Sequence, residues 1–241
     1  MEWHILCKSG DIARYVLLPG DPGRVQRIVA QMDEARLVTE NREFIVYTGT
    51  MAGVPLSVCS TGIGGPAAAI ALEELANIGG DVFIRVGSCA GRQSDIAIGM
   101  PLIISAAHRG EGTSAAYLPP EFPAVADLDI TIALRDAATE LGADHRLGIG
   151  MTRDAFYRVD LDEAERFTRA GVIAAEMEAA TLFVVGAFRR VRVGCIAVPD
   201  ANRWLTVQPT PEERRVLFAQ GERQMIAIAL RAVQLLAGRG I

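Results

Sequence analysis

The chain has 241 residues, half of them hydrophobic, and a formal net charge of −5 at pH 7. This length supports one large α/β domain or two small ones, and the acidic balance excludes a general electrostatic attraction to nucleic acid. No apolar run is long enough to span a bilayer, no signal-peptide pattern opens the chain and the four cysteines form no CxxC pair, so we expect a reduced, cytoplasmic protein without a metal.

The first half of the chain predicts strands that alternate with helices. A buried strand, YVLLP (15–19), stops at a Gly-Asp-Pro turn and is followed by an amphipathic helix. Residues 43–61 have the pattern of a β-hairpin, and residues 65–80 that of a helix with proline in its first turn. Two apolar strands follow, at 81–88 and 100–107. The hairpin predicts a mixed sheet rather than a purely parallel one.

The second half continues this alternation without a repeat, a low-complexity tract or a linker. The predicted elements are a helix at 129–142, a strand at 146–152, a strand at 170–177 that leads into a helix at 178–190, a strand at 193–199 and a helix at about 211–237. We therefore expect a single α/β domain over residues 1–241, a three-layer α/β/α sandwich with a mixed central sheet. Its functional site should lie at the carboxyl ends of the strands.

Two predicted strand ends combine glycines with an arginine, which suits the binding of an anion. In LLPGDPGRV (17–25), two glycines let the backbone approach a ligand and Arg24 lies near the start of a helix. In FIRVGSCAGR (83–92), Arg85 stands inside an otherwise apolar strand, where its charge needs a partner. A structural ion pair and a plain turn are the alternatives, and two such strand ends together favour a bound anion.

The segment AAEMEAATL (174–182) places Glu176 and Glu178 inside an apolar run. Residues two apart in a strand share a face, so both carboxylates are expected to point into a cleft while Met177 faces the other way. Carboxylates accept hydrogen bonds from adjacent sugar hydroxyls, which makes such a cleft suitable for a ribosyl group. An exposed pair at a helix start is the alternative, and the apolar flanks argue against it.

Seven motifs together resemble those of the hexameric nucleoside phosphorylases, the branch that holds bacterial-type purine nucleoside phosphorylase and uridine phosphorylase. The motifs, in the family's order, are LLPGDPGRV (17–25), NREF (41–44), STGIGGPAAAIALEEL (60–75), RVGSCAG (85–91), EFPAVADLD (121–129), DAFY (154–157) and AAEMEAATL (174–182). The resemblance implies an α/β fold with a mixed sheet and no metal or organic cofactor. It also implies that inorganic phosphate cleaves a nucleoside to free base and pentose 1-phosphate.

The resemblance further implies a phosphate site that two subunits share. The residues it assigns to phosphate within one subunit are Gly20, Arg24, Arg85 and Ser88. Arg42 would reach into the neighbouring subunit's site, and His4 would act across the same dimer on the 5′-hydroxyl. Without the family, Arg42 is a surface arginine and His4 a lone histidine near a terminus. We expect a homo-oligomer, as a hexamer of three dimers, with no nucleic-acid or membrane partner.

The ribose and the base have their own implied contacts. Glu178 would hold the sugar hydroxyls, with Met177 lining the ribose and Glu176 nearby. Negative charge there suits a ribosyl group that becomes cationic as the glycosidic bond breaks. The residues implied to contact the base are Cys89, Ala90, Phe156, Ala175 and Asp200.

The residues after the FY pair and after the late strand favour a purine base. Uridine phosphorylases of the family recognise uracil with a glutamine and an arginine shortly after this pair, and FYRVDLDEAERF (156–167) has no glutamine. The purine enzymes place an aspartate after the late strand to donate a proton toward N7, assisted by an arginine of the last helix; Asp200 and Arg214 match these. A loop-capping aspartate is the alternative for Asp200.

Other motifs favour uridine, so the base is not fixed by sequence. STGIGGP and EFPAVADLD look uridine-like, Asn202-Arg203 can be aligned with a pair of that branch, and Arg158 is a displaced candidate for uracil recognition. A nucleosidase, which uses water, and a nucleoside-binding protein are further alternatives, and Arg24 and Arg85 argue against both. We expect a purine nucleoside phosphorylase, with uridine phosphorylase as the alternative.

Overall fold

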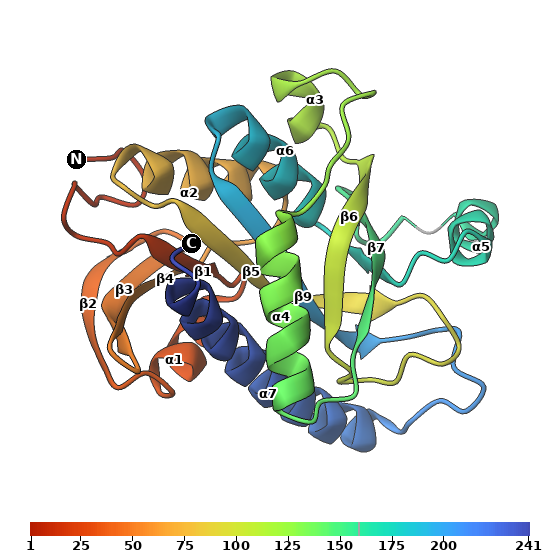
Figure 1. Ribbon diagram of the computed structural model, residues 1–241. Helices are drawn as coiled ribbons and strands as arrows, with labels where there is room; N and C mark the ends of the chain where they lie inside the picture. Colours follow the sequence, from red (N-terminus) through yellow and green to blue (C-terminus); the bar gives the residue numbers. More distant parts are fainter. Residues whose placement is uncertain (159) are drawn as a thin grey trace.

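A mixed sheet forms the centre of the computed structural model, which describes residues 1–241 except residue 159. In the described part of the chain, nine strands follow the order β2-β3-β4-β1-β5-β8-β7-β6-β9 (Figure 1). The strands are β1 (Tyr15–Leu18), β2 (Glu34–Asn41), β3 (Phe44–Met51), β4 (Val54–Cys59), β5 (Val82–Gly91), β6 (Leu102–Gly110), β7 (Arg146–Arg153), β8 (Ala174–Glu176) and β9 (Arg192–Ala201). β5 also pairs in parallel with β9, so the second half of the sheet closes on itself.

Helices cover both faces of this sheet. They are α1 (Pro22–Val29), α2 (Gly65–Asn77), α3 (Thr113–Tyr117), α4 (Leu128–Glu140), α5 (Leu161–Arg169), α6 (Ala179–Arg189) and α7 (Pro211–Gly238). α2 and α6 pack on one face, whereas α1, α4 and α7 pack on the other (Figure 1). None of the helices in the described residues combines the length and the hydrophobicity needed to cross a membrane.

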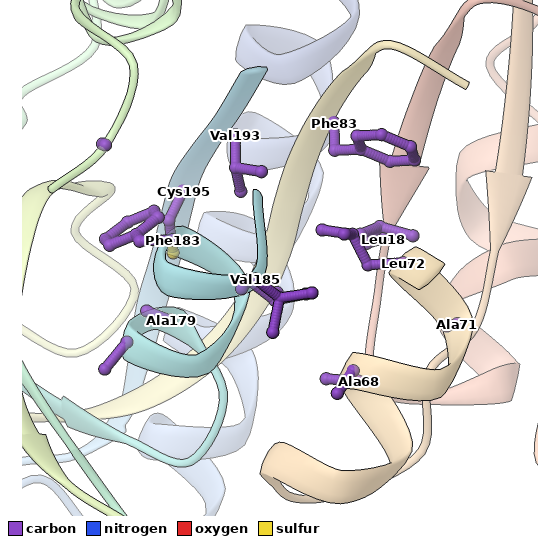
Figure 2. Packing of buried hydrophobic residues seen from close by; sticks show 14 of the residues in the cluster. Leu18, Ala68, Ala71, Leu72, Phe83, Ala179, Phe183, Val185, Val193 and Cys195 are labelled. Atoms are coloured by element: carbon purple, nitrogen blue, oxygen red, sulfur yellow. The ribbon is translucent and has the colours of Figure 1, made fainter. Parts of the chain in front are cut away.

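The core follows from the alternation of apolar side chains along the central strands. Leu18 on β1 and Phe83 on β5 point toward Leu72 of α2 and toward Val185 of α6 (Figure 2). Leu17, the neighbour of Leu18, faces the opposite cluster under α1, α4 and α7. Each fully buried side chain of this size stabilises the fold by about 1.5–3 kcal/mol. This packing fixes the strand ends that carry the polar groups of the site.

The structure departs from the predicted elements where the hydrophobic pattern is weak. β2 was not predicted because it is an edge strand with mostly exposed and polar side chains, EARLVTEN. α3 and α5 were also missed, since α3 is short and α5 is strongly polar. β8 is confined to Ala174–Glu176, and β9 continues through Asp200 to Ala201. These last two differences change how the site residues are presented.

Candidate active site

A cavity of about 640 Å³ lies at the carboxyl ends of β1, β5, β8 and β9. It gathers most of the residues singled out in the sequence, in agreement with the expected position for a site in an α/β fold. Those that line it are Gly20, Arg24, Arg85, Ser88, Cys89, Ala90, Phe156, Ala175, Glu176, Met177, Glu178 and Asp200. His4, Arg42 and Arg214 do not line it.

Arg24 is held rigidly at one end of this cavity. Its Nε donates to Glu222 Oε1 at 2.6 Å, and its Nη1 donates to the Val86 carbonyl at 3.1 Å. Glu222, on α7, also binds Arg27 at 2.7 Å. Asp21 caps the N-terminus of α1 and accepts from the Gly23 amide at 2.8 Å. The buried Glu222 was missed, although a glutamate on the apolar face of the last helix is the signal that would have found it.

Arg85 lies between two buried carboxylates at the same end of the cavity. Its Nε donates to Glu176 Oε2 at 3.0 Å, and its Nη2 forms an ion pair with Glu178. Burial opposes the charge of Arg85, but Glu178 and Glu176 outweigh this and raise its pKa above the ordinary value. A Cβ built on Gly20 would lie 3.9 Å from Arg85 Nη1. The guanidinium therefore also faces the glycine turn that follows β1.

Glu176 and Glu178 converge on Arg85, but not by the strand alternation that the sequence suggested. β8 ends at Glu176, and Glu178 is the N-cap of α6. Glu176 Oε2 accepts from the amides of Glu178 and Ala179, both at 2.8 Å, and this turns the chain into the helix. Because the strand stops there, Met177 lines the cavity instead of facing away from it.

Glu178 accepts fewer hydrogen bonds from the protein than Glu176 does. Its Oε1 accepts from the Gly64 amide at 2.6 Å. Burial raises the pKa of Glu178, and the nearby Arg85 only partly offsets this. Glu176 is more fully bonded, since its Oε1 also accepts from the Thr152 hydroxyl at 2.5 Å. Glu178 is thus the carboxylate better placed to accept hydrogen bonds from a ligand.

Asp200 and its neighbour Ala201, the last two residues of β9, both line the cavity. The Asp200 side chain is exposed, but partial desolvation raises its pKa, and a hydrogen bond to its own backbone and the charges of Arg214 and Arg24 lower it by smaller amounts. Arg214 lies exposed in the first turn of α7, so it acts on Asp200 through its charge at a distance. A carboxyl with a raised pKa in a cavity can supply a proton.

The remaining wall is apolar and partly open. Cys89, Ala90 and Ala175 line it, and burial raises the pKa of the Cys89 thiol, which keeps it neutral. Phe156 also lines it but is 67% exposed, with Tyr157 packed edge-on at 5.0 Å between ring centroids. Arg153, which the sequence did not indicate, adds a cation to this wall. This end is less enclosed than the end at Arg24.

His4 and Arg42 lie beside each other outside the cavity of their own chain. The Asn41 side chain donates to the His4 carbonyl at 2.7 Å, and Arg42 is the next residue, in the turn between β2 and β3. Arg42 is exposed, with φ of 55°. The His4 ring contacts Glu74 at 2.6 Å. The backbone of His4 therefore lies next to the β2–β3 turn that carries Arg42.

The residues suggested for uracil recognition differ in their burial, and none of them lines the cavity. Asn202 is buried and structural, since its amide donates to the carbonyls of Gln93 and Ile96 at 2.8 and 2.7 Å. Arg203 and Arg158 are exposed and do not line the cavity. In the described residues, no cluster of three or more His, Cys, Asp or Glu side chains is arranged to hold a metal ion.

Comparison with known proteins places the chain among enzymes of one family. Residues 14–234 match the phosphorylase superfamily. The chain is 46% identical to uridine phosphorylase of Thermococcus kodakarensis over 98% of its own length and 87% of the relative. It is 39% identical to guanosine phosphorylase of Halorubrum lacusprofundi over 83% of each chain. The crystal structure of uridine phosphorylase from Vibrio fischeri matches with a TM-score of 0.91 and 32% identity over 96% of both chains, which confirms the expected fold class.

Proposed function

The chain belongs to the phosphorylase superfamily, and from that premise we propose that it is a nucleoside phosphorylase that transfers the pentosyl group of uridine to inorganic phosphate. The observation that carries the proposal is the meeting of Arg24, Arg85 and the Glu176–Glu178 pair at one end of a cavity. Cations there hold phosphate, and carboxylates hold a sugar that becomes cationic.

The reaction follows from the charges at this end. Phosphate is a weak nucleophile, so Arg24, Arg85 and the amides near Gly20 and Ser88 must hold it under C1′. Glu178 accepts hydrogen bonds from the ribose hydroxyls, while Glu176 keeps Arg85 oriented. Because Arg85 bridges the carboxylates and the glycine turn, it couples the position of the sugar to that of phosphate.

We favour uridine as the substrate, whereas the sequence motifs favoured a purine nucleoside. The similarity to uridine phosphorylases at 46% and 32% identity supports this choice. A purine nucleoside such as guanosine is the second candidate, supported by the guanosine phosphorylase relative and by Asp200, whose raised pKa suits a proton donor.

The test is base release from uridine, cytidine, guanosine, inosine and adenosine, each with and without phosphate. We expect uridine to react fastest and only when phosphate is present. Equal release without phosphate would show a nucleosidase and refute the proposal. Faster release from guanosine than from uridine would establish the second candidate instead.

His4 and the turn with Arg42 lie close together and outside the cavity of their own chain, which supports a dimer in which each subunit completes its partner's site, as in a hexamer of three dimers. Co-expression of His4→Ala with Glu178→Ala should restore activity, because a hybrid dimer has one site with both groups intact. The separate variants serve as controls. A monomer with full activity, detected by light scattering at assay concentration, would refute the shared site.

A further inference from the structure

Arg92, the first residue after β5, is a buried guanidinium without an anionic partner. It is 5% exposed, and its Nε has no hydrogen-bond partner. Its Nη2 contacts the Met151 sulfur at 2.9 Å, and a thioether is a weak acceptor. Unlike Arg24 and Arg85, it forms no ion pair with a carboxylate in the described part of the chain. A buried charge left in this condition requires an explanation.

Arg92 does not line the cavity, but it lies next to residues that do. Ala90, two residues before it, pairs with Ala175, and both line the cavity. Met151, which Arg92 contacts, pairs with Ala175 from the other side. Arg153, two residues after Met151, lines the cavity itself. Arg92 therefore lies behind the wall that faces away from the phosphate end.

The charges around Arg92 are mostly of its own sign. Burial and the charges of Arg153 and Arg203 lower its pKa, and Glu163 opposes them. An arginine remains protonated under such conditions. Two cations, Arg92 and Arg153, therefore lie at or behind this wall, and neither Arg92 nor Arg153 forms an ion pair in the described part of the chain.

A guanidinium has donors only, so it selects oxygen acceptors. On the edge of a base far from the sugar, uracil presents O4 and guanine O6, whereas cytosine and adenine present amino donors. In phosphorolysis the C1′–N bond breaks with its electron pair going to the base while a phosphate oxygen bonds to C1′. The base anion then takes a proton from water, and until it does, a cation beside its carbonyl oxygen stabilises it.

We propose that Arg153, which lines the cavity, and the buried Arg92 behind the same wall together select nucleobases with a carbonyl oxygen on that far edge, Arg153 by direct contact and Arg92 through its charge. This inference rests on the proposed nucleoside phosphorolysis. It accounts for recognition of uracil in a chain that lacks the glutamine expected after the FY pair.

The test compares Arg92→Met with wild type on uridine and cytidine at saturating phosphate. Methionine has a similar length and no charge, so it should pack against Met151. We expect kcat/KM for uridine to fall about 10–100-fold, because a charge that favours a carbonyl oxygen is removed, with cytidine changed by less than about threefold. The KM for phosphate should stay at the wild-type value. Arg92→Lys should restore part of the uridine activity.

Arg169→Met is the matched control, because Arg169 is exposed on α5 and does not line the cavity. It should behave as wild type. Wild-type protein that phosphorolyses no nucleoside would overturn the proposed function and this inference together. An active wild type whose Arg92→Met variant keeps the uridine-over-cytidine preference would overturn only the role of Arg92, and so would an equal loss on both nucleosides with a lower melting temperature.

Discussion

The two ends of the cavity differ in how their charges are balanced. At the end that we propose for phosphate (the phosphate end), Arg24 is paired with Glu222 and Arg85 with both Glu176 and Glu178. At the end that we propose for the base (the base end), Phe156 is mostly exposed, and Arg92 behind the wall has no anionic partner in the described residues. The first end is therefore organised before a ligand arrives, whereas the second depends on the substrate to complete it. Binding of phosphate and sugar, which all nucleosides need, and recognition of the base, which sets specificity, are thus proposed to lie at different ends of the cavity.

The largest expected difference between the ends is in stability. Arg85→Met leaves Glu176 and Glu178 buried without a cation, so the free energy of unfolding should fall by about 3–5 kcal/mol. Arg92→Met removes an unpaired buried charge and should leave it unchanged or raise it. The orphaned carboxylates of the Arg85 variant bind protons more readily when folded, so its deficit should shrink as the pH falls toward 5. Urea denaturation at two pH values measures both; equal losses for the two variants would contradict the comparison.

Asp200 tests whether the base end supplies a proton. If guanosine is a substrate, Asp200→Asn should lower its kcat by about 10²–10⁴-fold, the range for general acid catalysis. Uridine should lose far less, because its leaving anion is stabilised at a carbonyl oxygen. Steady-state kinetics with both nucleosides distinguishes these outcomes. A uridine loss as large as that of guanosine would mean that the proton from Asp200 serves both bases.

Glu178 tests whether the phosphate end treats all nucleosides alike. Glu178→Gln retains an acceptor but loses the charge that faces the ribose, so kcat/KM should fall about 10–100-fold. The loss should be the same for uridine and guanosine, since the sugar is common to both. Parallel measurement on the two substrates provides the check. A base-dependent loss would show that the two ends are not independent.

Phe156 should give the smallest effect. The ring lines the base end but is 67% exposed, so Phe156→Ala removes a stacking surface without opening the core. We expect KM for uridine to rise by about tenfold or less, with kcat nearly unchanged. Tyr157→Ala is the matched control, since Tyr157 is 93% exposed and does not line the cavity. A larger effect for Tyr157→Ala would show that Tyr157, and not Phe156, stacks on the base.

The geometry of the proposed phosphate end could be predicted from the sequence better than that of the proposed base end, for a physical reason. A strand followed by Gly-Asp-Pro and a helix-start arginine is a local pattern, so the place of Arg24 could be inferred from neighbouring residues. Glu176 and Glu178 were recognised because charges in an apolar run are conspicuous, although the strand ended earlier than expected. Arg92 follows glycine in an ordinary-looking loop, and its isolation depends on what β7 and β9 bring near it. The β5–β9 pairing that closes the sheet joins segments more than a hundred residues apart, and no local pattern reveals it.

The Arg24–Glu222 ion pair joins the first helix to the last across 198 residues of sequence. During synthesis, Arg24 leaves the ribosome long before its carboxylate exists, so the nascent chain cannot bury this guanidinium at low cost until α7 has emerged. We therefore expect the phosphate end to assemble among the last events of folding. A ribosome that stops before Glu222 would release a chain with its strands present and this charge still in solvent, a ready substrate for quality-control proteases.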